Sequence, residues 1–189
     1  MGFIRQSVLE YGAGYSTLFW ASRAKHVLSI EHNEDWHKKI TRLVPSNVDL
    51  QLRTLDQYPD VEGTFDIIVN DGYARERTRY RCAKASLPHL NSDGFIILDN
   101  SDWLPATCCY LRENGLIQMD FSGFVPGNPH TQTTSFFLTR DFKPRVVKLF
   151  PTGGTGYNWE TNLEQELKSE RPFQVCCSSA GRATPRRNR

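Results

Sequence analysis

The chain of 189 residues has no long hydrophobic run, no strong excess of one charge, and only five cysteines. No apolar stretch approaches the roughly 20 residues that cross a bilayer, and no hydrophobic signal segment opens the sequence. The start, Met1-Gly2, has Gln6 where a myristoylation signal needs serine or threonine. We therefore expect a soluble, cytoplasmic protein without a membrane partner.

The cysteines and the charges exclude two further classes of protein. The cysteines are odd in number, form no CxxC pair, and include neighbours that cannot readily bridge each other. This usage favours a reducing compartment over a disulfide scaffold. Lys and Arg number 23 against 21 Asp and Glu, so overall charge indicates no nucleic-acid partner. The arginines near the C-terminus are interpreted as part of a solvated tail.

The most informative stretch runs from Val8 to Thr17. It has the pattern of a strand, then a turn with glycine at positions 12 and 14, then a hydroxyl residue suited to the start of a helix. Glycine has no Cβ, so the backbone can approach a ligand and adopt positive φ. Exposed backbone N–H groups at a helix start favour a nucleotide-like ligand.

Strand and helix patterns alternate along the rest of residues 7–140. Helical patterns cover 16–23, follow Asn33, and recur at 80–90, where Tyr80, Ala83, Leu87 and Leu90 form a stripe, and at 104–111. Beyond the first strand, strand patterns occupy 26–30, 48–55, 65–72, 94–100, 117–122 and 133–139.

The alternation predicts an α/β protein with a doubly wound, mostly parallel, seven-stranded Rossmann-like sheet. No helix pattern separates the last two strands, so we expect them to form an antiparallel pair at one edge. Residues 1–145 are predicted to be one ligand-binding domain, and 146–189 a poorly ordered tail.

Acidic residues stand at the carboxyl ends of the predicted strands, where such sheets bind ligands. Glu31 ends the second strand about 20 residues after Glu10, where a carboxylate can accept both hydroxyls of a ribose. Enzymes that use NAD share this acid, but their glycine fingerprint needs a third glycine where this chain has Thr17.

With these features the chain resembles the class I S-adenosylmethionine-dependent methyltransferases. They carry an acidic-x-Gly-x-Gly turn like Glu10 to Gly14, and an acid that ends the second strand like Glu31. The resemblance covers about residues 7–140. It implies that the chain binds S-adenosylmethionine and transfers the methyl group of this cofactor to an oxygen atom of a small-molecule acceptor.

The resemblance also implies roles for residues around the glycines. Gly12 and Gly14 would let the backbone approach the amino-acid part of the cofactor, and Glu10 would support that turn. Glu31 would bind the ribose. His32, beside it, would form a wall of the cofactor pocket rather than act as an acid or base.

Four residues further along the chain complete the implied site. Leu55 and Asp56 would flank the adenine. Asp71 would face the methionine end of the cofactor or the acceptor. His130, in the loop before the last strand, is a candidate base.

A similarity to catechol O-methyltransferase-like enzymes adds a possible metal site. Those enzymes hold a divalent metal with an Asp after the fourth strand and an Asp-Asn pair after the fifth, as in Asp71, Asp99 and Asn100 here. These oxygens suit Mg²⁺. The same enzymes have a lysine where this chain has Ala74, and the next residue, Arg75, stays protonated and cannot serve as a base. The alternative is that the three residues cap loops and touch the cofactor.

Arginines 75, 77, 79 and 81 follow Asp71. On a helix, 75 and 79 share one face and 77 and 81 another, so the arginines form no single stripe. We expect solvated helix charges, with Arg75 as the candidate for contact with an acceptor carboxylate or phosphate. Cys82 is expected in the core.

Two other functions remain open from the sequence. The chain could be a cofactor-binding module without activity, or a truncated inactive methyltransferase, because the sequence identifies no definite general base. It could also be an NAD-dependent oxidoreductase. The identity of the acceptor and the oligomeric state are not indicated by the sequence.

Overall fold

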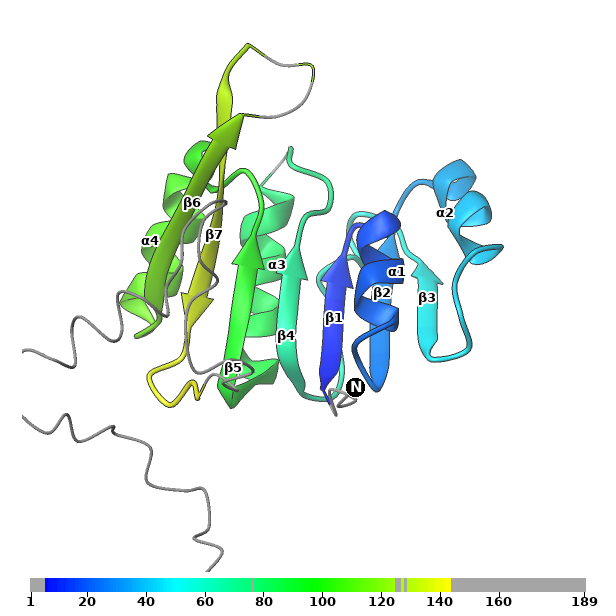
Figure 1. Cartoon of the computed structure of the whole chain (residues 1–189), viewed down its shortest axis with the longest axis horizontal. Helices are drawn as coiled ribbons and strands as arrows, with labels where there is room; N and C mark the ends of the chain where they lie inside the picture. The colour runs from blue at the N-terminus through cyan, green and yellow to red at the C-terminus, as the bar shows by residue number, and fades with distance from the viewer. Residues whose placement is uncertain (1–5, 76, 125–126, 128, 144–189) are drawn as a thin grey trace, which may run out of the picture. The chain divides into compact units, whose positions relative to one another are not determined.

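Seven strands form one mixed sheet in the order β3-β2-β1-β4-β5-β7-β6 (Figure 1). The computed structural model describes residues 6–75, 77–124, 127 and 129–143, and the predicted tail at 146–189 lies outside them. The strands are β1 Ser7–Tyr11, β2 His26–Glu31, β3 Val48–Leu52, β4 Phe65–Asn70, β5 Leu90–Leu98, β6 Ile117–Phe124 and β7 Thr131–Leu138. The helices are α1 Tyr15–Ala21, α2 Glu34–Thr41, α3 Thr78–Ser86 and α4 Pro105–Glu113, with short 3-10 turns η1 Leu87–His89 and η2 Ser101–Trp103.

The pairing of the strands confirms the predicted fold class. β3, β2, β1, β4 and β5 pair in parallel, while β7 pairs antiparallel with both β5 and β6. The carboxyl ends of the five parallel strands therefore meet at one edge of the sheet, and the β6–β7 hairpin extends beyond that edge (Figure 1). None of the described helices is long and apolar enough to cross a membrane.

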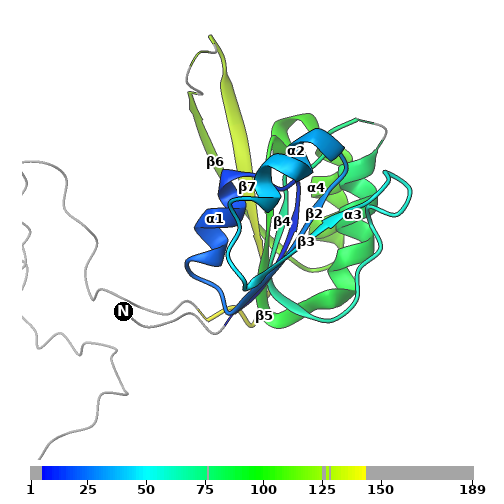
Figure 2. The ribbon, with the colours of Figure 1, turned by 90° about the vertical axis from the view of Figure 1, so that its right-hand side faces the viewer.

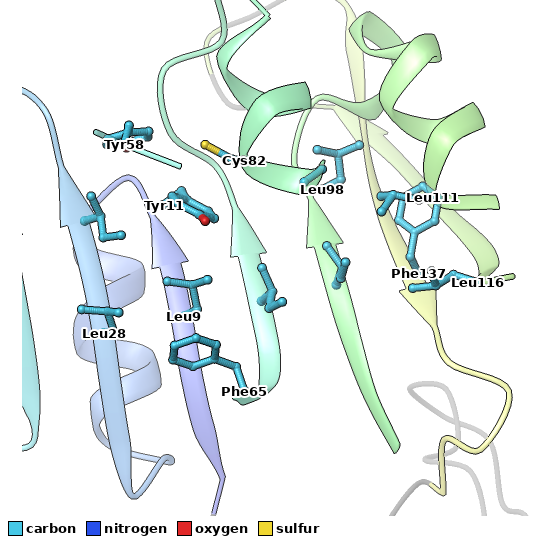
Figure 3. Packing of buried hydrophobic residues seen from close by; sticks show 14 of the residues in the cluster. Leu9, Tyr11, Leu28, Tyr58, Phe65, Cys82, Leu98, Leu111, Leu116 and Phe137 are labelled. Carbon is cyan, nitrogen blue, oxygen red and sulfur yellow. The ribbon is translucent and has the colours of Figure 1, made fainter. Parts of the chain in front are cut away.

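Alternate residues of the central strands build two separate apolar layers. On one face Leu9 and Tyr11 of β1 pack with Cys82 of α3 and with residues of α4. On the other face Val8 packs against Ala21 of α1. Figure 2 shows α1 on one side of the sheet and α3 and α4 on the other, and Figure 3 shows the first of these layers.

The helix pattern predicted at 80–90 is wrong in its second half. Helix α3 ends at Ser86, and Leu90 is the first residue of β5 instead of the end of a helical stripe. Pro88 explains the difference, because proline lacks the N–H that a helix interior requires and its neighbour Leu87 is disfavoured in α conformation.

Candidate functional site

The turn between β1 and α1, residues 12–14, is packed directly on the chain that follows β4. Gly12 has φ +95°, and a Cβ on it would lie 2.8 Å from the carbonyl oxygen of Asp71 and from the Cα of Gly72. The N–H of Gly12 donates to the carbonyl of Ile30 at 2.9 Å. Only glycine fits both this backbone conformation and this contact.

Glu10 lies fully buried beneath this glycine turn. Its carboxylate accepts hydrogen bonds from the hydroxyls of Thr17 at 2.5 Å and Ser29 at 2.7 Å. The oxygen of Thr17 in turn accepts the N–H of Gly14 at 2.9 Å. Burial raises the pKa of Glu10, and the hydroxyl donors oppose that rise. Thr17, which replaces the third glycine of the NAD fingerprint, therefore links the buried acid to the turn.

Glu31 ties the end of β2 to the same turn. Its Oε2 accepts the N–H of Ala13 at 3.2 Å, and its Oε1 accepts the N–H groups of His32 at 2.8 Å and Asn33 at 2.7 Å. The side chain of Asn33 caps α2 by accepting the N–H of Trp36, whose indole N–H donates to the carbonyl of Ala13 at 2.6 Å. The start of α2 and the glycine turn are thus held in one fixed arrangement.

A cavity of about 730 Å³ opens in front of the glycine turn. It brings the turn together with Glu31, His32 and Asp71, all of which the sequence placed in a site. The remaining lining residues are Tyr15, Ser16, Asn33, Asp35, Trp36, Lys39, Tyr58, Gly72 and Tyr73.

An aromatic wall of this cavity carries two polar atoms without a hydrogen bond among the described residues. They are the hydroxyl of Tyr58, a fully buried residue, and Nδ1 of His32, which lies 3.0 Å from Glu31 Oε1 outside hydrogen-bond geometry. The ring of His32 lies 5.8 Å from that of Tyr58 and 5.0 Å from that of Tyr73. Buried polar atoms are normally paired, so these two are suited to a polar ligand.

Leu55, Asp56 and His130 do not line the cavity, although the sequence placed them in the site. The side chain of Asp56 is 99% exposed, and its carboxylate lies 4.0 Å from Arg81. Leu55 precedes it in the same connection, and His130 is exposed in the β6–β7 hairpin. The adenine contacts of Leu55 and Asp56 and the base role of His130 stay predictions.

Arg79 is buried, contrary to the expectation of a solvated helix charge. It is 5% exposed, and its Nη2 lies 3.1 Å from Asp71 Oδ1. Its Nη1 donates to the carbonyl of Asp99 at 2.5 Å and to Asn100 Oδ1 at 3.3 Å, and its Nε donates to the carbonyl of Gly72 at 2.8 Å. We call Asp71, Arg79, Asp99 and Asn100 the Arg79 cluster.

A different reading of the helical period would have found Arg79. The buried face of α3 includes Arg79, Cys82, Ala83 and Ser86, which follow the i, i+3, i+4, i+7 pattern. The helical stripe predicted from the sequence begins at Tyr80, one residue after Arg79, and therefore leaves Arg79 out. Burial raises the pKa of the Cys82 thiol to about 12, in agreement with its expected place in the core. No comparable pattern marks Tyr58, which lies in the connection between β3 and β4.

Asp71 has an altered acidity at the floor of the cavity. Burial, and next the negative charge of Asp99, raise its pKa to about 7, while the Arg79 guanidinium acts in the opposite direction. The side chain is nevertheless 44% exposed, so the carboxylate is accessible to a ligand in the cavity. A carboxyl with a pKa near neutrality can accept a proton at neutral pH.

The predicted Mg²⁺ site is not supported by the described residues. They contain no group of three His, Cys, Asp or Glu side chains that could hold a metal ion. Asp71, Asp99 and Asn100 do come together, but the guanidinium of Arg79 donates to the side-chain oxygens of Asp71 and Asn100 and lies 3.9 Å from the carboxylate of Asp99. These oxygens therefore already have a cation.

Two other hollows share no lining residue with this cavity. One, of about 710 Å³, includes Ser7, His26 and Phe65 at the amino ends of their strands, beneath the helix-free connection between β3 and β4. The other, of about 630 Å³, is lined by aromatic residues of α3, η2 and α4, including Tyr80 and Tyr110. Neither contains a residue that the sequence placed in the site.

Comparisons with known proteins find similarity to methyltransferases. A family model described as a methyltransferase domain matches residues 9–101, from β1 to the first residue of η2, and this range includes the Arg79 cluster. No curated protein matches the chain by sequence.

Three solved structures illustrate the similarity of fold. Precorrin-6y C5,15-methyltransferase from Geobacter metallireducens GS-15 is 14% identical with a TM-score of 0.56, over 73% of this chain and 83% of that chain. The N-methyltransferase NodS from Bradyrhizobium japonicum WM9, in complex with S-adenosyl-L-homocysteine, is 15% identical with a TM-score of 0.55, over 71% and 78%. TYW2 from M. jannaschii, in complex with AdoMet, is 18% identical with a TM-score of 0.55, over 73% and 69%.

Proposed function

Because the chain belongs to the class I S-adenosylmethionine-dependent methyltransferases, we propose that it transfers a methyl group to an oxygen of a small-molecule acceptor. The observation that carries this proposal is the cavity in front of the glycine turn, which has Glu31 on one wall and Asp71 at its floor. The acidic-x-Gly-x-Gly turn and the strand-end acid stand together there, as the resemblance requires.

The residues present fit S-adenosylmethionine in this cavity. Gly12 and Gly14 leave the backbone open to the amino-acid part of the cofactor, and Glu31 Oε2, which accepts one N–H, keeps a lone pair that can accept a ribose hydroxyl. The unpaired Tyr58 hydroxyl and His32 Nδ1 supply two further polar partners on the aromatic wall. These groups would together hold the cofactor.

Asp71 is the residue that we assign to proton transfer. When bound, S-adenosylmethionine would supply a methyl group on a sulfonium sulfur, and the electrons of the C–S bond would stay on sulfur when that carbon bonds to the acceptor oxygen. The Asp71 carboxylate takes the proton of the acceptor hydroxyl, because its raised pKa matches neutral pH. Proximity and orientation of the two substrates supply the rest of the rate acceleration.

The hollow beside α3 and α4 supports an acceptor of low molecular mass. Its lining includes Tyr80, Trp103 and Tyr110, which offer flat apolar surface, and Arg77 and Glu113, which offer charge. Ala74, three residues after Asp71 in the chain, also lines it. His130, the other candidate base, does not line the cofactor cavity.

The experiment that tests the function is a thermal-shift titration with S-adenosylhomocysteine and, separately, with NADH. A ligand at 100 times its dissociation constant adds about 2.7 kcal/mol to the free energy of unfolding. We expect this stabilisation with S-adenosylhomocysteine and none with NADH. Stabilisation by NADH alone would contradict the proposal, and methyl-labelled donor with acceptor mixtures then tests transfer itself.

A further inference from the structure

Three oxygen-bearing side chains that suit a divalent cation are organised here around an arginine. Asp71 follows β4, and Asp99 and Asn100 follow β5, so the carboxyl ends of two neighbouring strands bring them together. Arg79 reaches them from α3, and its 5% exposure shows that the guanidinium is inside the cluster. The backbone of α3 is tied to β4 as well, because the Asn70 amide donates to the Arg79 carbonyl at 2.8 Å.

The guanidinium uses most of its donors within the cluster. Nε, Nη1 and Nη2 together bind two backbone carbonyls and the side-chain oxygens of Asp71 and Asn100. The second carboxylate, Asp99, lies 3.9 Å from Nη1 through Oδ2 and accepts the hydroxyl of Thr134 at 2.8 Å through Oδ1. Arg79 is thus fixed in position and has little surface left for a substrate.

A metal ion and this guanidinium cannot share the same oxygens. Mg²⁺ requires ligands at about 2.0–2.1 Å in a near-octahedral arrangement. An ion at that distance from Asp71 Oδ1 and Asn100 Oδ1 would lie within a few ångströms of a permanently charged guanidinium. Two such cations repel strongly in a partly desolvated site, and arginine cannot lose its charge.

We propose that Arg79 is the resident cation of this site, a positioning residue that holds Asp71 toward the cavity and makes the reaction independent of divalent metal. The resulting role in methyl transfer rests on the proposed function above. The claim that arginine stands in place of a metal ion rests only on the Arg79 cluster. In this role Arg79 compensates the negative charges of Asp71 and Asp99, and it also orients Asp71.

The test compares divalent-cation binding by the wild-type chain, Arg79→Met and Arg79→Lys, with neither methyl donor nor acceptor present. Each protein is unfolded thermally in EDTA and in increasing Mg²⁺, and Mn²⁺ binding is followed by its paramagnetic effect. We expect no response in the wild type. In Arg79→Met the freed oxygens bind the metal, and the unfolding equilibrium constant falls about 100-fold when Mg²⁺ is at 100 times its dissociation constant.

Arg79→Lys separates charge from a merely structural role. It keeps a cation in the cluster but loses the planar donor fork, so it loses stability like Arg79→Met yet gains no Mg²⁺ response. Arg81→Met, on the exposed side of the same helix, is the matched control and gains none either.

Two results would overturn the proposal: a saturable Mg²⁺ response of the wild type, or no response in a folded charge-free variant. If Arg79→Met does not fold, Arg79→Gln, which retains an amide donor, takes its place, and the wild-type measurement needs no variant. Binding of S-adenosylhomocysteine is measured separately. If the proposed function is wrong, S-adenosylhomocysteine does not bind, while the metal-binding results stay as expected.

Discussion

The two sides of the cofactor cavity are built from different kinds of interaction. On the side of the glycine turn, Glu31 binds three backbone N–H groups, and Gly12 packs on backbone atoms. On the side of the Arg79 cluster, side chains from α3 and from the ends of β4 and β5 bind one another and two carbonyls. The first side is fixed by the path of the main chain, and the second by one buried charge.

This difference predicts how each side responds to substitution. A side built on backbone contacts tolerates changes of neighbouring side chains but not a change of chain conformation. A side built around one guanidinium depends on that group, because removing one partner leaves the other charges uncompensated. Binding of cofactor should belong mainly to the first side, and acidity and stability to the second.

The largest effect is expected from removal of the buried cation. Arg79→Met should lower the free energy of unfolding by about 4 kcal/mol, since it leaves two carboxylates without their neighbouring cation and two backbone carbonyls without their donor. Arg81→Met, whose exposed partner is Asp56, should change it by less than about 0.5 kcal/mol. Urea unfolding measures both. Equal losses would show that Arg79 contributes no more than a surface charge.

A slightly smaller effect is expected from a methyl group in the glycine turn. Gly12→Ala should cost about 3 kcal/mol of stability, because it adds a contact at 2.8 Å to the penalty for positive φ. Gly63 is the matched control: its φ is +89° and nothing lies within 4 Å of an added Cβ. Gly63→Ala should cost only about 1 kcal/mol. If the two losses are equal, the contact with the Asp71–Gly72 backbone has no energetic weight.

The sequence predicted the first side of the cavity well and the second side incompletely. Strand periodicity and the spacing from Glu10 to Glu31 identify the turn because both are properties of short, regular segments. Asp71, Asp99 and Asn100 were also found, since each directly follows a buried strand. The role of Arg79 was missed because its partners lie up to 21 residues away in the chain and meet it only through the sheet.

The placement of Tyr58 illustrates a second limit. Tyr58 lies in an irregular connection, where neither helical nor strand period applies, yet it is fully buried against Tyr11 and His32. Leu55 and Asp56, three and two residues before it, were predicted to flank the adenine instead. Periodic patterns predict regular elements, whereas the path of a loop depends on which side chain the core accepts.

The ribose contact is tested at Glu31. Glu31→Gln keeps the shape of the side chain but replaces one acceptor oxygen by a donor, so the dissociation constant of S-adenosylhomocysteine should rise about 10- to 100-fold. Glu34→Gln, an exposed acid that pairs with Lys38 on α2, should leave it unchanged. Isothermal titration calorimetry measures both. Unchanged affinity for S-adenosylhomocysteine in Glu31→Gln would show that Glu31 does not contribute to binding.

The acidity of Asp71 gives a pH-dependent prediction for the second side. Its pKa is raised from 3.8 to about 7 in the folded chain, so the folded state binds the proton more tightly than the unfolded state. Its contribution to stability is therefore fully present below about pH 4 and is lost as the pH rises through about 7.

Carboxyl carbon NMR measures this titration directly. The midpoint of Asp71 should lie near 7 in the wild type and should fall in Asp99→Asn, which removes the neighbouring negative charge. A midpoint in the ordinary range for aspartate in the wild type would contradict the proposed base role, because such a group holds its proton too weakly at neutral pH.

The smallest effect is expected at the hydroxyl of Tyr58, and it distinguishes binding from stability. This hydroxyl is buried without a partner among the described residues, so Tyr58→Phe should not lower the stability of the free protein and should raise it by about 1 kcal/mol. If the hydroxyl donates to the bound cofactor, the dissociation constant of S-adenosylhomocysteine should rise about fivefold.

Tyr11 offers the opposite case, because its hydroxyl already donates to the carbonyl of Pro59 at 3.3 Å and does not line the cavity. Tyr11→Phe should therefore lower stability by about 1 kcal/mol and leave binding unchanged. The same pattern in both variants would mean that the Tyr58 hydroxyl faces the core and not the ligand.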